Sequence, residues 1–251
     1  MLSRLLATTF LLFTSTAWAT DFRIETKVFA NEEEIPISQN TTLFQAGVVY
    51  DFLESPRRVA IFRHERGDEP GLFLLIDPER RLKTEMTTDR IDAAIDKLTT
   101  WAAEQKNPLL RFAAEPQLEE TFDKESGVLT LTGSRMSYRL STTPTGQREV
   151  WDDLSAYFNE YAKLNCLLSS AMPPLPRLEV NKALARHRIV PVEVNLSLAD
   201  PEQTSLRAEH LFTWRLSKDD RAQIAMVGEQ LVNFRDVSNA EFRDEMATAA
   251  K

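Results

Sequence analysis

Alternating apolar and polar residues, interrupted by short turns, occupy Thr41–Met86 and constrain the fold of this chain most strongly. Alternation rich in aromatic and β-branched residues predicts strands, and tight turns between them predict antiparallel pairing. We interpret the stretch as three or four consecutive strands. In the first of them, Thr41–Glu54, Gly47 predicts a bend or bulge that curves the sheet.

The strands of this stretch carry apolar residues on both faces. Leu72–Ile76 is apolar at every position, and Arg81–Met86 returns after an Asp-Pro turn with Leu82, Thr84 and Met86 on one side. Antiparallel sheets commonly leave one face in water. Something must therefore cover each side of this sheet: helices, a ligand or a second sheet.

The rest of the chain alternates between helical and strand patterns. Apolar residues at helical spacing predict helices over 90–105, 150–168, 177–187 and 217–234, and period-two patterns predict strands over 21–29, 119–125, 128–133, 136–142, 189–198 and 206–216. Seven glycines in 251 residues are few for a barrel built from many tight hairpins. We therefore predict an α+β fold: a strongly curved antiparallel sheet, or half-barrel, of about seven to nine strands, with helices packed on its concave face.

The first 19 residues read as a secretory signal peptide. Arg4 supplies a positive start, an apolar run follows, and Ala17-Trp18-Ala19 matches a cleavage site. We expect export to the periplasm or the extracellular space, with residues 20–251 forming one domain. No later stretch is long and apolar enough to predict a membrane span.

Charge and cysteine content exclude several functional classes. The formal net charge is −8, and loss of a leader that contains one Arg and no acid makes it −9. An acidic chain without a basic cluster is a poor nucleic-acid binder, so we expect no nucleic-acid partner. Cys166 is the one cysteine in the sequence, so it has no internal disulfide partner, and its helical, amphipathic setting predicts a buried structural thiol.

No catalytic or metal-binding pattern is visible. His64, His187 and His210 lack metal-ligand spacing, and the chain contains no nucleophile elbow, P-loop or dinucleotide-binding motif. We predict a protein that is not an enzyme, with no metal and no cofactor. The alternative is a hydrolase whose Ser or Thr hydroxyl meets His64 or His210 in an open cleft only after folding.

The excess of apolar residues on the strands has two interpretations. One is ordinary core. The other is a groove on the concave face that binds an apolar or amphipathic ligand, such as an acyl chain of a lipid or lipoprotein. Its candidate lining is Phe44, Val48, Tyr50, Phe52, Phe62, Phe73, Leu75 and Met86, with Ile91, Ile95 and Trp101 from a covering helix. A further alternative is an interaction or structural module of the envelope, acting through an exposed sheet edge or the helix 177–187.

The order of leader, meander, helix, further strands and helix resembles the LolA/LolB-type lipoprotein carriers. The resemblance covers about residues 21–142 and includes GLFLLIDPERRLKTEM (Gly71–Met86), where a D-P-x-x turn joins two strands. It implies an unclosed antiparallel barrel with helices as a lid, around a cavity for acyl chains. The segment from Pro173 to Phe234 departs from a minimal carrier of this kind, and no family binding residue can be placed on this chain.

Overall fold

A computed structural model describes residues 21–145, 148–169, 172–199 and 205–243. In these residues, twelve strands form one sheet with the order β12-β6-β5-β4-β3-β2-β1-β11-β10-β9-β8-β7. The strands are β1 (Phe22–Ala30), β2 (Ser38–Gln45), β3 (Val48–Leu53), β4 (Arg58–Arg63), β5 (Leu72–Asp77), β6 (Leu82–Thr87), β7 (Leu118–Asp123), β8 (Val128–Gly133), β9 (Met136–Pro144), β10 (Ile189–Leu198), β11 (Leu206–Thr213) and β12 (Arg235–Asp236).

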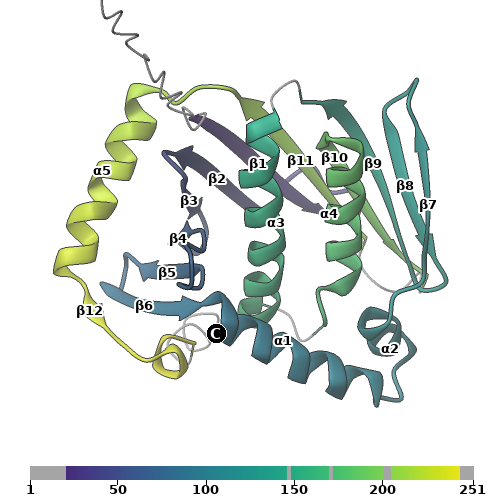
Figure 1. Ribbon diagram of the computed structural model, residues 1–251, viewed down its shortest axis with the longest axis horizontal. Coiled ribbons are helices and arrows are strands. Elements are labelled where there is room, and N and C mark those ends of the chain that lie inside the picture. Colours follow the sequence, from purple (N-terminus) through teal and green to yellow (C-terminus); the bar gives the residue numbers. More distant parts are fainter. Residues whose placement is uncertain (1–20, 146–147, 170–171, 200–204, 244–251) are drawn as a thin grey trace, which may run out of the picture.

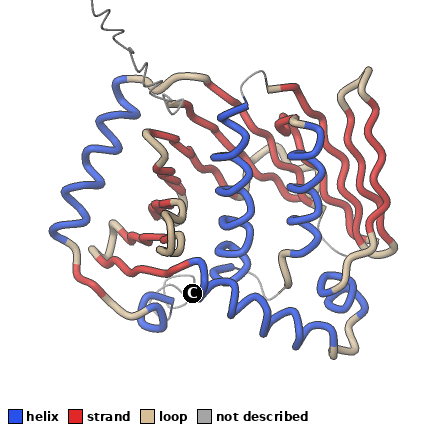
Figure 2. The backbone as a smooth tube through the Cα atoms, viewed as in Figure 1, coloured by secondary structure: helices blue, strands red, loops and turns tan. Residues whose placement is uncertain are grey.

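Five labelled helices accompany the sheet: α1 (Thr88–Ala103), α2 (Pro108–Ala114), α3 (Arg148–Ser169), α4 (Leu175–His187) and α5 (Lys218–Asn233). Helices α3 and α4 lie side by side across the strands, while α5 lies apart from them, at the left of the view (Figure 1; Figure 2). In the described part of the chain, no helix is long and apolar enough to cross a membrane.

The predicted fold class is confirmed in outline. The protein is α+β, and the ends of the sheet, β12 and β7, do not pair with each other, so the sheet is not closed. The described strands outnumber the predicted seven to nine. The sheet is also mixed, because β12, which has no sequence pattern of its own, pairs parallel to β6, whereas the other ladders are antiparallel.

The two halves of the sheet are joined by strands distant in the sequence. Strands β1 to β6 form a meander in which each strand pairs with the next, and β7 to β9 form a second one. The hairpin β10–β11 then inserts between them, with β10 on β9 and β11 on β1. The first strand thus lies in the interior of the sheet rather than at an edge.

The prediction of one bent strand over Thr41–Glu54 is wrong, because the segment is the hairpin β2–β3. Ala46 and Gly47 form its two-residue turn, and both have positive φ, 51° and 75°, as a type I′ turn requires. Phe44 consequently pairs with Val49, not with the residues that follow it in steps of two. Each residue of β3 therefore lies on the opposite face of the sheet from the one that a single continuous strand would give it.

The main core lies between one face of the sheet and helices α1 to α4. Phe22, Phe73 and Leu140 from the sheet, Ile91 from α1, and Leu154 and Leu184 from α3 and α4 belong to this cluster and are almost completely buried. These are the residues that period-two and helical spacing place on inward faces. The arrangement positions α3 and α4 directly over the central strands.

A second, smaller core lies on the opposite face of the sheet, under α5. Leu43, Ile61, Leu74 and Ile76 from β2, β4 and β5 pack there with Val227 of α5. This second layer accounts for the apolar residues on both faces of the meander. Helices cover both sides of these strands.

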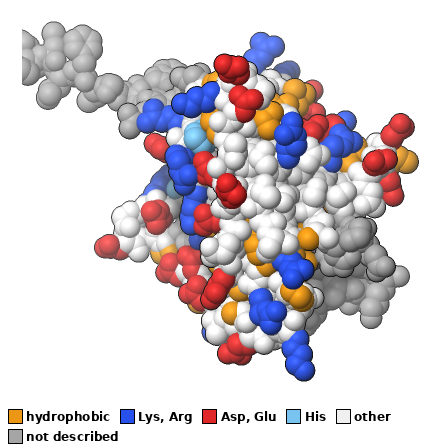
Figure 3. All heavy atoms as spheres, turned by 90° about the vertical axis from the view of Figure 1, so that its right-hand side faces the viewer, with side chains coloured by type: hydrophobic (Ala, Val, Ile, Leu, Met, Phe, Trp, Pro, Cys, Tyr) orange, Lys and Arg blue, Asp and Glu red, His pale blue; other side chains and the backbone are white. Residues whose placement is uncertain are grey.

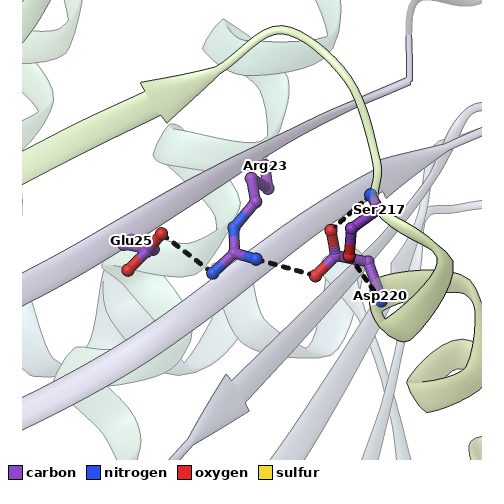
Figure 4. Close-up of polar contacts among 4 residues, drawn as sticks. All are labelled: Arg23, Glu25, Ser217 and Asp220. Carbon is purple, nitrogen blue, oxygen red and sulfur yellow. Dashed lines mark hydrogen bonds and ion pairs between the residues drawn. The ribbon is translucent and has the colours of Figure 1, made fainter.

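The start of α5 is tied to β1 by a polar cluster. Ser217 and Asp220 form a capping box, in which each side chain accepts a hydrogen bond from the other's backbone N–H. The guanidinium of Arg23 donates to the buried Asp220 carboxylate at 2.9 Å and also contacts Glu25 (Figure 4). These contacts orient α5 as it begins its path across the second core.

Candidate functional site

The eleven residues predicted to line one groove occupy three different environments. Seven lie in the main core: Phe44, Phe62, Phe73, Leu75, Met86, Ile91 and Ile95. Val48, Tyr50 and Phe52 belong to the second core under α5, because the Ala46-Gly47 turn reverses their facing. Trp101 is 45% exposed at the surface of α1. The structure therefore brings seven of them together and separates the other four from that group.

Side chains of α3 fill the space next to the seven core residues. The ring of Tyr157 packs edge-on against Phe44, with centroids 5.6 Å apart, and Phe62 stacks on Phe73 at 4.7 Å. The position of the predicted ligand is thus taken by the protein's own helices. A ligand in this layer would need either a separate cavity or a displacement of α3.

One cavity lies at the junction of α3 and α4, against β9. Its volume is about 160 Å³. Its wall is mainly apolar and consists of Tyr138, Ala162, Asn165, Cys166, Met172, Pro173, Pro174, Pro176 and Arg177. Tyr138 comes from the main-core face of the sheet, so the cavity belongs to the layer in which the groove was predicted.

Among the described residues, Arg177 is the one cationic residue in the wall of this cavity. It forms no hydrogen bond or ion pair with the described part of the chain. Burial lowers the pKa of its guanidinium, and the nearby Tyr138 acts in the opposite direction. Arg177 is also the third residue of α4, where the helix dipole disfavours a positive charge. The fold therefore holds a poorly compensated cation beside an apolar space.

Thr26 and His210 form a polar pair close to Arg177. They face each other across β1 and β11, and the Thr26 Oγ1 to His210 Nδ1 distance is 3.0 Å. Burial, and then the charge of Arg177, lower the pKa of His210 to about 3. The His210 Nε2 atom is buried and has no hydrogen-bond partner in the part of the chain that the structure describes. This imidazole is therefore neutral at physiological pH.

A second polar cluster connects the sheet to α3. The buried carboxylate of Asp51 accepts hydrogen bonds from Asn40 at 2.5 Å, Thr42 at 2.6 Å and the hydroxyl of Tyr161 at 2.8 Å. Desolvation by burial raises the pKa of Asp51, and these donors oppose that change. The hydroxyl of Tyr157 lies near Asp51 and Thr42 but forms no hydrogen bond of normal geometry. The cluster fixes α3 to β3.

The structure provides part of the geometry that a hydrolase would need, namely a hydroxyl and a carboxylate beside one histidine in an open cleft. Thr26 and His210 supply a hydroxyl at hydrogen-bond distance from a histidine, but the pair is largely buried, and no carboxylate of the described chain pairs with His210. His64 has the reverse arrangement, with the Asp153 carboxylate 3.7 Å from Nε2 and no hydroxyl bonded to that atom. Neither histidine has both partners among the described residues.

Cys166 is buried, as predicted, and forms part of the cavity wall. Its Sγ lies 2.9 Å from the carbonyl oxygen of Met172. Burial raises the pKa of the thiol to about 11. Because the thiolate is the reactive form, this cysteine is a weak nucleophile at neutral pH.

No family model matches the chain, and no curated protein matches it. Among the described residues, no group of three His, Cys, Asp or Glu side chains has an arrangement that could hold a metal ion.

Sequence reasoning missed Arg177 and Asp51. For Asp51 a signal exists, because a charged residue interrupts the apolar strand VVYDFL and points to a buried polar contact. For Arg177 the signal is weaker: a cation follows a proline-rich helix start, where an acidic residue is preferred.

Proposed function

We propose that this protein is exported and is a non-catalytic binding protein for an amphipathic molecule with an acyl chain, such as a lipid or a lipoprotein. In this proposal the sheet curves as a half-barrel around α1 to α4, and the helices form a movable cover. The observation that carries the proposal is the apolar cavity at the α3–α4 junction, in the layer between the sheet and its helices. The likeness to LolA/LolB-type carriers supports the same function.

The size of the cavity limits how much of a ligand it takes without rearrangement. A cavity of about 150 Å³ accommodates a benzene-sized guest. The observed volume of about 160 Å³ therefore accepts roughly six carbon atoms. Burying six CH₂ groups contributes about 5 kcal/mol before the costs of association, which corresponds to submillimolar affinity at best. A longer chain would bind more tightly if α3 or α4 moved away from the sheet.

The interaction-module alternative has less support. Exposed large apolar residues are scattered over several elements, including Ile35, Leu211, Met226 and Val232. The end of the molecule formed by β7 and β8 shows hydrophobic side chains in small separate groups between charged ones (Figure 3). A docking surface for a protein would more commonly present one contiguous apolar patch.

Titration with a fluorescent fatty acid tests the proposal. The wild-type protein should show saturable binding and a rise in its thermal unfolding midpoint. Ala162→Leu adds three carbon atoms in the cavity wall and should weaken binding at least about fivefold, since the added volume displaces ligand. Ala222→Leu, the same change at an exposed position of α5, is the control and should bind like wild type. Absence of saturable binding to folded wild-type protein would contradict the proposal.

A further inference from the structure

We infer that Arg177 is the head-group anchor of the site and that the ligand is a fatty carboxylate, bound with its acyl chain in the cavity at the α3–α4 junction. The inference rests on the proposed function and adds the chemical class of the ligand. A guanidinium can bind a carboxylate through two parallel hydrogen bonds, and Arg177 lies in the wall of an apolar cavity.

Arg177 lacks a counter-charge from the described part of the chain. Arg177 pairs with no acidic residue in the described chain, and the nearby Glu179 is engaged with Lys182 on the same helix, at 2.7 Å. The Arg177 side chain is partly buried, and withdrawing a charge from water without giving it a partner is costly. An anionic ligand would supply the partner that the chain itself does not.

Arg177 lies at the beginning of α4. The first turn of this helix contains no acidic residue, and its N-cap is Pro174, which has no side-chain oxygen to accept a hydrogen bond. The helix dipole therefore adds positive potential to that of the guanidinium. Both act on the end of the cavity where Pro174, Pro176 and Arg177 lie.

The composition of the cavity wall favours a monoanion with an apolar tail. The described part of the cavity wall contains one cation, which matches a single carboxylate better than a doubly charged phosphate. The remaining wall, including Ala162, Cys166 and Met172, is suited to methylene groups. The nearby His210 adds no second positive charge, because burial and the charge of Arg177 lower its pKa to about 3.

The test compares decanoate with decanol, which have equal chain length but differ in head-group charge, and decyl phosphate serves as a third ligand. Calorimetric titration of the wild-type protein at neutral pH should give at least about tenfold tighter binding of decanoate than of decanol, because charge-assisted hydrogen bonds are involved. Decyl phosphate should bind more weakly than decanoate. Equal binding of decanoate and decanol would overturn the inference and leave the proposed function standing, whereas binding of none would refute both.

Two variants assign the selectivity to Arg177. Arg177→Met should remove the preference for decanoate while leaving decanol binding within about twofold of wild type, which also shows that the variant is folded. Arg186→Met, on the same helix but exposed and paired with Glu120, should retain the preference. If Arg177→Met keeps the full preference, Arg177 is not the anchor. Should Arg177→Met fail to fold, Arg177→Gln replaces it, and the wild-type comparison of the ligands decides the inference in any case.

Discussion

At the scale of single residues, two neighbouring polar groups in the main core differ in how many hydrogen bonds they form. Asp51 is surrounded by donors from three residues, whereas the Tyr157 hydroxyl beside it forms no regular hydrogen bond. A hydrogen bond to a buried charged group contributes more than one between neutral groups, and leaving such a group with fewer partners is costly. The neighbouring tyrosines of α3 should therefore respond differently to loss of their hydroxyls.

Tyr161→Phe should lower the free energy of unfolding by about 1–3 kcal/mol, because the Asp51 carboxylate loses a donor inside the core. Tyr157→Phe should not lower it, since its hydroxyl is buried without a hydrogen-bond partner among the described residues and its removal relieves a desolvation cost. Urea unfolding of the two variants measures the contrast. Equal destabilisation by both changes would show that the cluster does not depend on the Tyr161 contact.

His210 should make the protein less stable in acid. Its pKa is lowered to about 3 in the folded state, from an ordinary value of 6.5, so below pH 6.5 the unfolded chain binds a proton that the folded one does not. Its contribution to stability is therefore present above pH 6.5 and lost as the pH falls toward 3, by at most about 1.4 kcal/mol per pH unit.

His210→Gln removes this titration while leaving a polar partner for Thr26. Its unfolding free energy should decline less than that of wild type between pH 6.5 and pH 4, as measured by urea unfolding at several pH values. The raised pKa of Asp51 acts in the opposite direction, but it is common to both proteins and cancels in the comparison. Parallel pH profiles would contradict a buried neutral His210.

At the scale of elements, the hairpin β2–β3 depends on a turn in which one of the two central residues is poorly suited to its conformation. Type I′ turns need positive φ at both central positions, which Gly47 adopts readily and Ala46 does not. An L-residue with a Cβ loses roughly 1–2 kcal/mol in this conformation, and asparagine tolerates it best among the non-glycine residues. A substitution at Ala46 that tolerates positive φ should therefore stabilise the hairpin.

Ala46→Asn should raise the free energy of unfolding by about 0.5–1 kcal/mol, because Asn-Gly is the preferred type I′ pair. The control is Gly47→Ala, where a Cβ meets no atom within 4 Å, so any loss of stability reports on φ alone. Thermal unfolding of both variants provides the measurement. A lower midpoint for Ala46→Asn would mean that contacts of Ala46 outweigh its backbone strain.

The same turn shows what sequence patterns can and cannot predict. Alternation and helical spacing are local, so they predict most strands and helices close to their observed bounds. The phase of alternation, however, restarts after a two-residue turn, and Val48, Tyr50 and Phe52 were therefore assigned to the wrong face. Their cover, α5, comes from the far end of the sequence, and no local pattern identifies the sheet face on which a helix packs.

The candidate site was the least predictable part. The seven groove residues that did come together are core residues, and hydrophobic patterning cannot distinguish a filled groove from an open one. Arg177 belongs to no periodic pattern. Arg177 stands out because it has no partner among the described residues, and only the folded arrangement of α4 over β10 and α3 reveals this.

At the scale of the whole molecule, the position of β1 has consequences for the order of folding. Its neighbour β11 lies far along the chain, with Thr26 and His210 separated by 184 positions. The β1–β6 meander contains short-range hairpins and can form early, whereas closing a loop of this length is slow. Until β11 arrives, β1 presents an unpaired edge that can recruit other chains. We therefore expect the newly made chain to pass through a state in which the edge of β1 is unpaired and open to aggregation. A chaperone that binds unfolded chains, or rapid dilution, should then raise the yield of folded protein.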